Sequence, residues 1–196
     1  KIISDNDSRI NWKLKNNTIN LIRSREVSNT KFAKNLGVSK GYNKGLNLAL
    51  KFDYEYIVKL DCDFIISENL LSGLIETFEN NKYAVAVSPK VYYFKENKKT
   101  SIIWWKGVNF TKNYFRFQKT GKGASRKVED IGQFKGIHES EGICGCCVML
   151  KSSVLKQTGT LDEEFFFGPE DIEHSFRLRK FGKILNRNFS FIYKSS

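Results

Sequence analysis

Apolar and polar positions in the first half of the chain follow two patterns, one typical of buried strands and one of amphipathic helices. Short runs rich in β-branched and aromatic residues predict strands, and apolar residues at helical spacing predict helices between them. The predicted strands cover residues 1–4, 19–22, 56–60 and 84–88, and the predicted helices cover residues 41–51 and 67–80. We expect Pro89 to end the last strand and Ser67 to cap the second helix. This alternation predicts an α/β fold with a mostly parallel central sheet flanked by helices.

The second half of the chain begins with an aromatic-rich stretch and returns to the α/β pattern. Residues 91–119 predict strands at 102–105 and 114–117, and residues 120–127 predict a loop. The next predicted elements are a strand at 146–150, a short helix capped by Ser152 or Ser153 and ending near Gly159, a helix from Pro169 to about Phe181, and strands near 184 and at 189–193. Proline suits the first turn of a helix. Glycine suits the position after a helix end, which is where we expect Gly182.

The size and composition fit one globular domain. The 196 residues are 40% hydrophobic and include 16 phenylalanines, which is enough for a proper core. No apolar run approaches the length of a membrane span, and no secretory signal opens the sequence. Because the first residues already predict a strand, we expect this sequence to be part of a longer chain.

Four cysteines occur, and three of them are adjacent in Cys144-Gly145-Cys146-Cys147. A thiolate metal site usually needs two separated pairs of ligands, whereas the sequence has no second pair and two histidines. We therefore favour buried, reduced thiols in an intracellular protein over a metal site.

The net charge of +12 is unevenly distributed. Residues 95–127 carry ten Lys or Arg and one acid, whereas residues 129–173 carry ten Asp or Glu and three Lys. This separation indicates an anionic partner at one surface and a cation site at another. On charge alone, nucleic acid, an anionic membrane, a phosphorylated substrate and a merely solvated basic face all remain open.

Two carboxylates directly follow the predicted strand 56–60. Asp61 and Asp63 are one residue apart, so in extended backbone both side chains point the same way. Open α/β sheets bind ligands at the carboxyl ends of their strands, and Asp5 also follows a predicted strand. Hard carboxylate oxygens suit Mg²⁺ or Mn²⁺, which are typically shared with phosphate oxygens. The pattern indicates a divalent cation holding a diphosphate, and the alternative is a solvated polar loop.

A second acidic pair, Glu170 and Asp171, opens the last predicted helix behind three consecutive phenylalanines. A carboxylate in partly apolar surroundings can act as a general base and accept a hydroxyl proton. Acidic residues are also common in the first turn of any helix, so this pair alone does not define a site.

Taken together, these features resemble glycosyltransferase family 2, whose members are nucleotide-sugar enzymes with the GT-A fold. The resemblance extends over nearly the whole chain and is carried by Asp5-Asn6-Asp7-Ser8, the Asn35–Gly45 run, Asp61-Cys62-Asp63 (similar to the family's DXD motif), Gly142 with Met149-Leu150, and the run from Gly159 to Arg177. The most similar branch is the rhamnosyltransferase-like group of bacterial surface-polysaccharide enzymes.

The resemblance implies a role for each matching residue. On the donor side, Asp5 would bind the nucleobase, and Asn35, Gly41 and Asn43 would line the nucleotide pocket. Asp61 would contact the ribose or sugar phosphate, and Asp63, with Asp61 beside it, would hold Mg²⁺ or Mn²⁺. On the acceptor side, Asp171 would be the catalytic base and Glu170 would support it.

The resemblance also implies how the domain is organised. Residues 1–90 would form a nucleotide-sugar-binding half, and residues 91–196 an acceptor-binding half of one GT-A domain. The family's first strand has no counterpart here, so we expect a βα unit of roughly 30 residues upstream.

The implied activity is inverting transfer of a sugar from a UDP- or dTDP-linked donor to a hydroxyl of a glycan or lipid-linked acceptor. The implied setting is bacterial surface-polysaccharide synthesis in the cytoplasm, where the basic residues 95–127 would contact the inner face of the plasma membrane.

Two alternatives belong to other classes. The basic and aromatic residues 91–127 would also suit a module that binds single-stranded nucleic acid. That interpretation leaves both acidic pairs unexplained, so we expect no nucleic-acid partner. The other alternative is a catalytically inactive relative that acts in assembly, and the presence of Asp171 argues against it.

Overall fold

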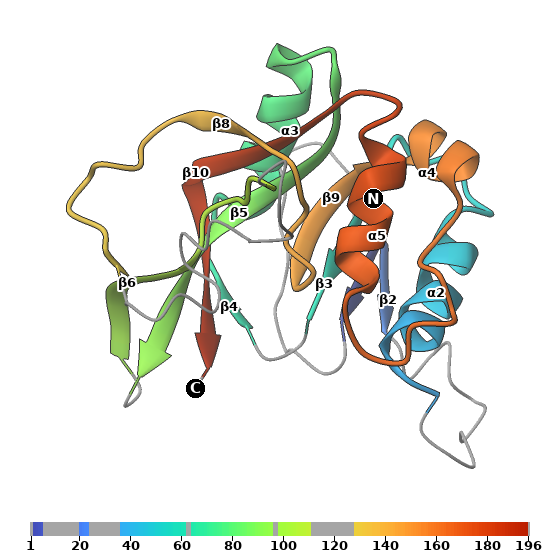
Figure 1. Cartoon of the computed structure of the whole chain (residues 1–196), viewed down its shortest axis with the longest axis horizontal. Helices are drawn as coiled ribbons and strands as arrows, with labels where there is room; N and C mark the ends of the chain where they lie inside the picture. The colour runs from blue at the N-terminus through green and yellow to red at the C-terminus, as the bar shows by residue number, and fades with distance from the viewer. Residues whose placement is uncertain are drawn as a thin grey trace.

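The computed structural model describes residues 2–5, 20–23, 36–61, 64–95, 98–110 and 128–195. Its described part contains one ten-stranded sheet (Figure 1). The main path runs in the order β2 (Asn20–Arg23), β1 (Ile2–Asp5), β3 (Tyr56–Leu60), β9 (Cys147–Lys151), β5 (Ala84–Lys95), β10 (Lys183–Ser195) and β4 (Phe64–Ile66). Off this path, β6 (Lys98–Trp105) pairs with β5, β7 (Val128–Glu129) pairs with β6, and β8 (Ile137–Ser140) pairs with β10.

Strand directions divide the sheet into parallel groups joined by an antiparallel strand. β2, β1 and β3 are parallel neighbours, and so are β5 and β10. β9 lies between the two groups and is antiparallel to β3 and β5, while β4 is antiparallel to β10. The predicted α/β fold with flanking helices is confirmed, and the sheet is mixed because β9 and β4 run against their neighbours.

Two apolar clusters, one on each face of the sheet, hold the layers together. Helices α2 (Val38–Ala49), α4 (Ser152–Thr158) and α5 (Glu170–Leu178) contribute to one cluster, and α3 (Leu70–Asn80) contributes to the other (Figure 1). Side chains of β3 alternate between the clusters, since Tyr56, Val58 and Leu60 face α3 whereas Ile57 faces the other three helices.

The predicted helix caps are wrong. α3 begins at Leu70 with Asn69 at its N-cap position, because β4 occupies residues 64–66 and moves the helix start downstream. The Ser67 hydroxyl makes no cap, and only its carbonyl accepts a hydrogen bond, from the Leu70 amide at 3.0 Å. β9 extends to Lys151, so Ser152 is already the first residue of α4 and neither Ser152 nor Ser153 caps it.

Pro89 does not end its strand, contrary to the sequence prediction. β5 continues through it to Lys95. The pairing of β5 with β10 is irregular just beyond Pro89, where the register shifts between Arg187 and Phe191. Proline lacks the amide hydrogen that a regular ladder needs, and strands tolerate it at such irregularities.

The end of the last helix also differs from the prediction. α5 ends at Leu178, so Gly182 is not its C′ residue, and the two predicted closing strands form the single strand β10. A Cβ at Gly182 would overlap the Tyr83 carbonyl oxygen, which accepts a hydrogen bond from the Lys183 amide at 2.8 Å. Gly182 therefore lets β10 begin close beside the turn before β5. The predicted elements at 114–117 and 120–127 lie outside the described residues. Among the described helices, none has the length and apolarity needed to cross a bilayer.

Candidate active site

The ends of two parallel strands bring Asp5 and Asp61 to one edge of the sheet. Asp5 is the last residue of β1, and Asp61 follows the last residue of β3. The register pairs Ser4 with Lys59, so the two strands end side by side. The backbone thus confirms that both acidic positions lie at carboxyl ends of neighbouring strands. The Asp5 side chain, Asn35 and Asp63 lie outside what the structure describes, so their roles stay predictions.

Asp61 is held by three elements. Its amide donates to the Cys146 carbonyl at 2.8 Å. Its Oδ1 accepts a hydrogen bond from the Tyr42 hydroxyl of α2 and lies 3.9 Å from Lys59 Nζ of β3. The Asp61 side chain remains 34% exposed. The carboxylate is therefore oriented by its neighbours while it still borders solvent.

Buried serine hydroxyls hold the turn between β8 and β9 in place. The Cys144 amide donates to Ser88 Oγ at 2.9 Å, and the Ile143 amide donates to Ser175 Oγ at 3.0 Å. Ser140 Oγ donates to the Gly142 carbonyl at 2.7 Å. Buried backbone groups in an irregular segment need such partners. These bonds attach residues 142–147 to β5 and to α5, which carries the second acidic pair.

Gly145 brings Asp171 into this site. A Cβ built on Gly145 would lie 2.7 Å from Asp171 Oδ2 and 3.2 Å from Asp171 Cγ, so the backbone and the carboxylate are in direct contact. The other side of this turn contacts the β3 end, where the Asp61 amide bonds to Cys146. The structure therefore brings Asp61 and Asp171, which are 110 positions apart, to the same turn.

The first turn of α5 holds both members of the second acidic pair. Asp171 is partly buried, and its carbonyl accepts a hydrogen bond from Ser175 Oγ at 2.6 Å. Glu170 is 8% exposed, and its Oε2 has no hydrogen-bond partner among the residues described. A buried carboxylate oxygen without a donor is costly, which marks Glu170 as a group that a bound hydroxyl would satisfy.

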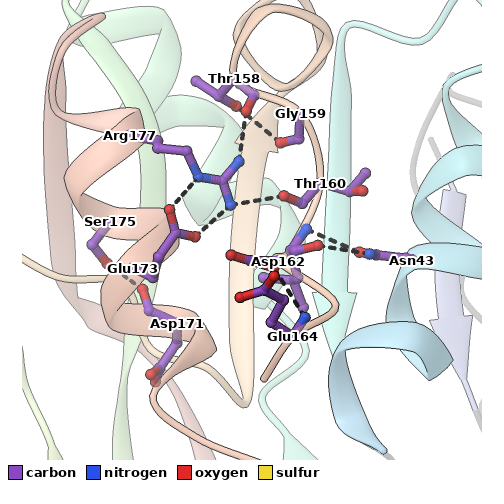
Figure 2. A network of polar contacts seen from close by, with 11 residues as sticks. Asn43, Thr158, Gly159, Thr160, Asp162, Glu164, Asp171, Glu173, Ser175 and Arg177 are labelled. Atoms are coloured by element: carbon purple, nitrogen blue, oxygen red, sulfur yellow. Dashed lines mark hydrogen bonds and ion pairs between the residues drawn. The ribbon is translucent and has the colours of Figure 1, made fainter. Parts of the chain in front are cut away.

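Arg177 fixes α5 against the loop that precedes it (Figure 2). Its guanidinium pairs with both oxygens of Glu173 at 2.6 Å. It also donates to the Thr158 carbonyl at 2.5 Å and to the Thr160 carbonyl at 2.8 Å. In Figure 2 the Asp171 side chain extends away from this cluster. Arg177 thus orients the helix without occupying the site.

Replacing Arg177 by lysine is expected to destabilise the protein by about 1–3 kcal/mol, because lysine cannot reach both carbonyls and the carboxylate together. Urea unfolding measures this loss. Arg179→Lys is the matched control, since Arg179 makes one partly exposed ion pair with Glu141 at 2.9 Å, and such pairs contribute about 0–1 kcal/mol. Equal losses in the two variants would contradict the anchoring role.

His174, in the second turn of α5, makes stability depend on pH. Burial lowers the pKa of His174 to about 3, the nearby Arg177 cation adds to this shift, and the Gly159 backbone opposes it. In the unfolded chain the pKa is about 6.5. Below that pH the unfolded state takes up a proton that the folded state refuses, so stability falls as pH decreases.

We expect this effect to cost about 2 kcal/mol between pH 7 and pH 5. His174→Gln should remove that part of the pH dependence of the unfolding free energy. His138 is the chain's other histidine, and it is exposed, so His138→Gln should leave the dependence unchanged. An identical pH dependence in wild type and His174→Gln would contradict the assignment.

Asn43 and Gly41 occupy different environments on α2. The Asn43 amide donates to the Leu161 carbonyl at 2.7 Å and to Glu163 Oε1 at 3.0 Å, and its oxygen accepts from the Leu161 amide at 2.9 Å. Asn43 is 2% exposed. In this structure it joins α2 to the loop before α5, and its predicted contact with the nucleotide is untested. A Cβ on Gly41 would meet nothing within 4 Å, so Gly41 borders open space.

The described residues fit a divalent cation that is shared with a ligand better than one enclosed by protein. Among them no group of three or more His, Cys, Asp or Glu side chains could hold a metal ion. Mg²⁺ and Mn²⁺ commonly use one or two carboxylates and take their other ligands from phosphates and water. Asp61 offers one such carboxylate at the site edge, and Asp63 would be the second.

Three described cysteines, Cys144, Cys146 and Cys147, are buried beside the site and form no disulfide with one another. Burial raises the pKa of the Cys146 and Cys147 thiols well above the usual value. Protonated thiols are poor metal ligands and poor nucleophiles, so these side chains serve as core residues behind Asp61.

Sequence analysis missed Lys59, Tyr42 and Gly145. Lys59 gave a signal, because a lysine inside an apolar strand needs a buried partner. Gly145 gave a weaker one, since glycine between buried residues often marks a close backbone approach. For Tyr42 the sequence contains no signal that distinguishes it from an ordinary core tyrosine.

Comparisons with known proteins identify the family and the fold. The model of the family described as Glycosyl transferase family 2 matches residues 2–159. Among 143 matching chains of solved structures is the crystal structure of GalNAc-T7 with UDP, GalNAc and Mn²⁺. It is 14% identical with a TM-score of 0.63, and the match covers 91% of this chain and 32% of that one. This chain therefore spans about a third of that protein. No curated protein sequence matches.

Proposed function

Since this chain belongs to glycosyl transferase family 2, we propose that it transfers a sugar from a nucleoside-diphosphate donor to a hydroxyl of an acceptor, with inversion at the anomeric carbon. The observation that carries this proposal is the convergence of Asp61 and Asp171 on the two sides of the Gly145 turn. In this proposal the donor diphosphate binds beside Asp61, at the carboxyl ends of the strands, and the acceptor hydroxyl loses its proton to Asp171.

On the donor side, Asp61 would contact the ribose or sugar phosphate, and Asp63 with Asp61 would hold Mg²⁺ or Mn²⁺. The cation would supply charge neutralisation for the departing diphosphate. GalNAc-T7 was crystallised with UDP and Mn²⁺, which makes UDP the first nucleotide to test and dTDP the second. Asp5, Asn35, Gly41 and Asn43 remain the proposed nucleotide contacts.

On the acceptor side, Asp171 would accept the proton of the attacking hydroxyl. The acceptor oxygen forms a bond to the anomeric carbon as the bond from that carbon to the diphosphate oxygen breaks. One base and one displacement require no covalent enzyme intermediate, so the stereochemistry inverts. The buried Glu170 would support Asp171 by accepting a hydrogen bond from a different hydroxyl of the acceptor.

The proposed setting is synthesis of a bacterial surface polysaccharide on a glycan or lipid-linked acceptor at the cytoplasmic face of the plasma membrane. The basic residues 95–127 support this setting, since lysines are attracted to anionic lipid. Reversing the charges of Lys119, Lys122 and Lys127 should weaken sedimentation with vesicles that contain phosphatidylglycerol. Unchanged sedimentation would contradict the proposed membrane contact, and it would not bear on the proposed transfer activity.

The transfer activity is tested by release of UDP or dTDP from a panel of nucleotide sugars in the presence of Mn²⁺. We expect release from one donor class, its loss on chelation with EDTA, and its loss in Asp171→Asn. Release that persists with EDTA and in Asp171→Asn would contradict both the metal requirement and the assignment of Asp171 as the base. No release from any donor, with or without added glycan acceptors, would argue for the inactive relative.

A further inference from the structure

Lys59 is a charged residue inside an otherwise apolar strand. It is 4% exposed and lies between Val58 and Leu60 in β3, whose residues are all buried. Strand alternation places it on the face of Ile57, toward α2 and α5. A buried ammonium is strongly unfavourable unless it is paired and hydrogen-bonded, so its partners indicate why the site contains it.

Its three partners come from three elements that converge on the site. The ammonium lies 3.8 Å from the centre of the Tyr42 ring on α2 and 3.9 Å from Asp61 Oδ1. It also donates a hydrogen bond to the Gly145 carbonyl. Tyr42 closes this group, because its hydroxyl donates to the same Asp61 oxygen. One ammonium thus restrains a carboxylate on one side and a backbone turn on the other.

The turn to which Lys59 is bonded, residues 142–147, also contacts Asp171, the proposed catalytic base. A Cβ built on Gly145 would lie 2.7 Å from Asp171 Oδ2, so the carboxylate lies against this glycine, while the Gly145 carbonyl accepts the bond from Lys59. Hydroxyls of Ser88 and Ser175 hold the preceding residues of the turn but do not reach Gly145 itself. Lys59 is therefore bonded directly to the residue at which the two halves of the site meet.

We propose that Lys59 is a positioning residue that sets the donor-side carboxylate Asp61 and the Gly145 turn beneath Asp171 relative to each other. The Tyr42 hydroxyl acts on Asp61, to which it donates its hydrogen bond. This inference rests on the proposed function, which names Asp61 the donor side and Asp171 the acceptor side. The connection of Asp61 to the Gly145 turn through Lys59 is a property of the fold. It predicts that the two residues have different effects when each is replaced.

The experiment compares Lys59→Met, which keeps an unbranched apolar stem, with Tyr42→Phe, which keeps the ring and removes one hydroxyl. Lys82→Met is the control, since Lys82 is an exposed lysine in the turn before β5. For each variant we would measure the Kd of UDP with Mn²⁺ by calorimetry and the hydrogen exchange of residues 142–147 by mass spectrometry. Thermal unfolding confirms that each variant folds.

Lys59→Met is expected to raise the Kd about tenfold or more, because Asp61 loses its ion pair. It should also speed exchange of residues 142–147 about tenfold, because the Gly145 carbonyl loses one charged hydrogen bond. Tyr42→Phe should raise the Kd several-fold, roughly 3- to 10-fold, and leave exchange within about twofold of wild type. Lys82→Met should change neither quantity.

Unchanged Kd and unchanged exchange in a folded Lys59→Met would overturn the proposal. Faster exchange in Tyr42→Phe would also overturn it, because the hydroxyl that this variant removes donates its hydrogen to Asp61 and not to the turn. If Lys59→Met does not fold, Tyr42→Phe tests whether this group of residues positions Asp61 for the nucleotide. A wild-type Kd in Tyr42→Phe would then overturn that part of the proposal. If the wild-type protein binds no UDP, the proposed function fails, whereas the exchange of residues 142–147 still tests the linkage.

Discussion

Asp171→Asn is expected to lower kcat about 10³-fold, since general acid–base catalysis contributes about 10²–10⁴-fold and asparagine cannot accept a proton. Asparagine has nearly the same shape, and Asp171 contacts the Gly145 backbone through its side chain. The substitution should therefore leave the turn in place. The rate would be measured as nucleotide release at saturating donor.

Binding separates this effect from damage to the site. The Kd of UDP with Mn²⁺ should stay within about twofold in Asp171→Asn, because the donor carboxylates are untouched. Glu164→Gln is the control, since Glu164 is an exposed acid in the loop that leads to α5, and its kcat should match wild type. A loss below tenfold in Asp171→Asn, with binding intact, would assign the base to another residue.

Gly145→Ala is expected to lower kcat about 10²-fold, because displacing a reacting group by about 1 Å costs that much. The new methyl group would lie 2.7 Å from Asp171 Oδ2 and 3.2 Å from Asp171 Cβ. A side chain moves more easily than the turn, which Ser88 and Ser175 hold through neighbouring amides. The carboxylate should therefore rotate away from its working position.

Gly41→Ala provides the matched control. It is the same chemical change in the same candidate site, but a methyl group at Gly41 meets nothing within 4 Å. Gly41 is also a proposed nucleotide contact, so any effect of Gly41→Ala on the donor would fall on its KM, and we expect the variant to keep kcat at saturating donor. Replacing a helix-interior glycine by alanine should stabilise α2 by roughly 0.5–1 kcal/mol. Equal kcat in Gly145→Ala and wild type would show that Asp171 works from a position the turn does not control.

Local patterns in the sequence were sufficient to predict an element where the structure depends on a single strand or a single helix face. The apolar run 56–60 predicted β3 and placed Asp61 at its end, and the structure confirms both. The expectation for Pro89 was wrong because its partner strand β10, about a hundred residues away in sequence, shifts register beside it. At that irregularity the ladder does not need the amide hydrogen that proline lacks. The predicted caps at Ser67 and Ser152 were wrong because adjacent strands take up the residues before the helices.

The contacts that build the site are long-range and leave little trace in sequence. Asn43 matches a family motif, yet in the structure its amide bonds to Leu161, 118 positions away. A lysine inside an apolar strand indicates that it needs a buried partner, but only the structure identifies α2 and the Gly145 turn as those that provide the partners of Lys59. Such partners depend on which helices cover which face of the sheet, and periodicity does not encode this.

Calorimetric binding of UDP and dTDP in the presence of Mn²⁺, repeated after addition of EDTA, tests directly whether the carboxyl edge of the sheet is a donor site. We expect binding of at least one of the two nucleotides, loss of that binding with EDTA, and loss in Asp63→Ala. Absence of binding to both nucleotides with Mn²⁺ present would contradict the proposal that this edge of the sheet is a donor site.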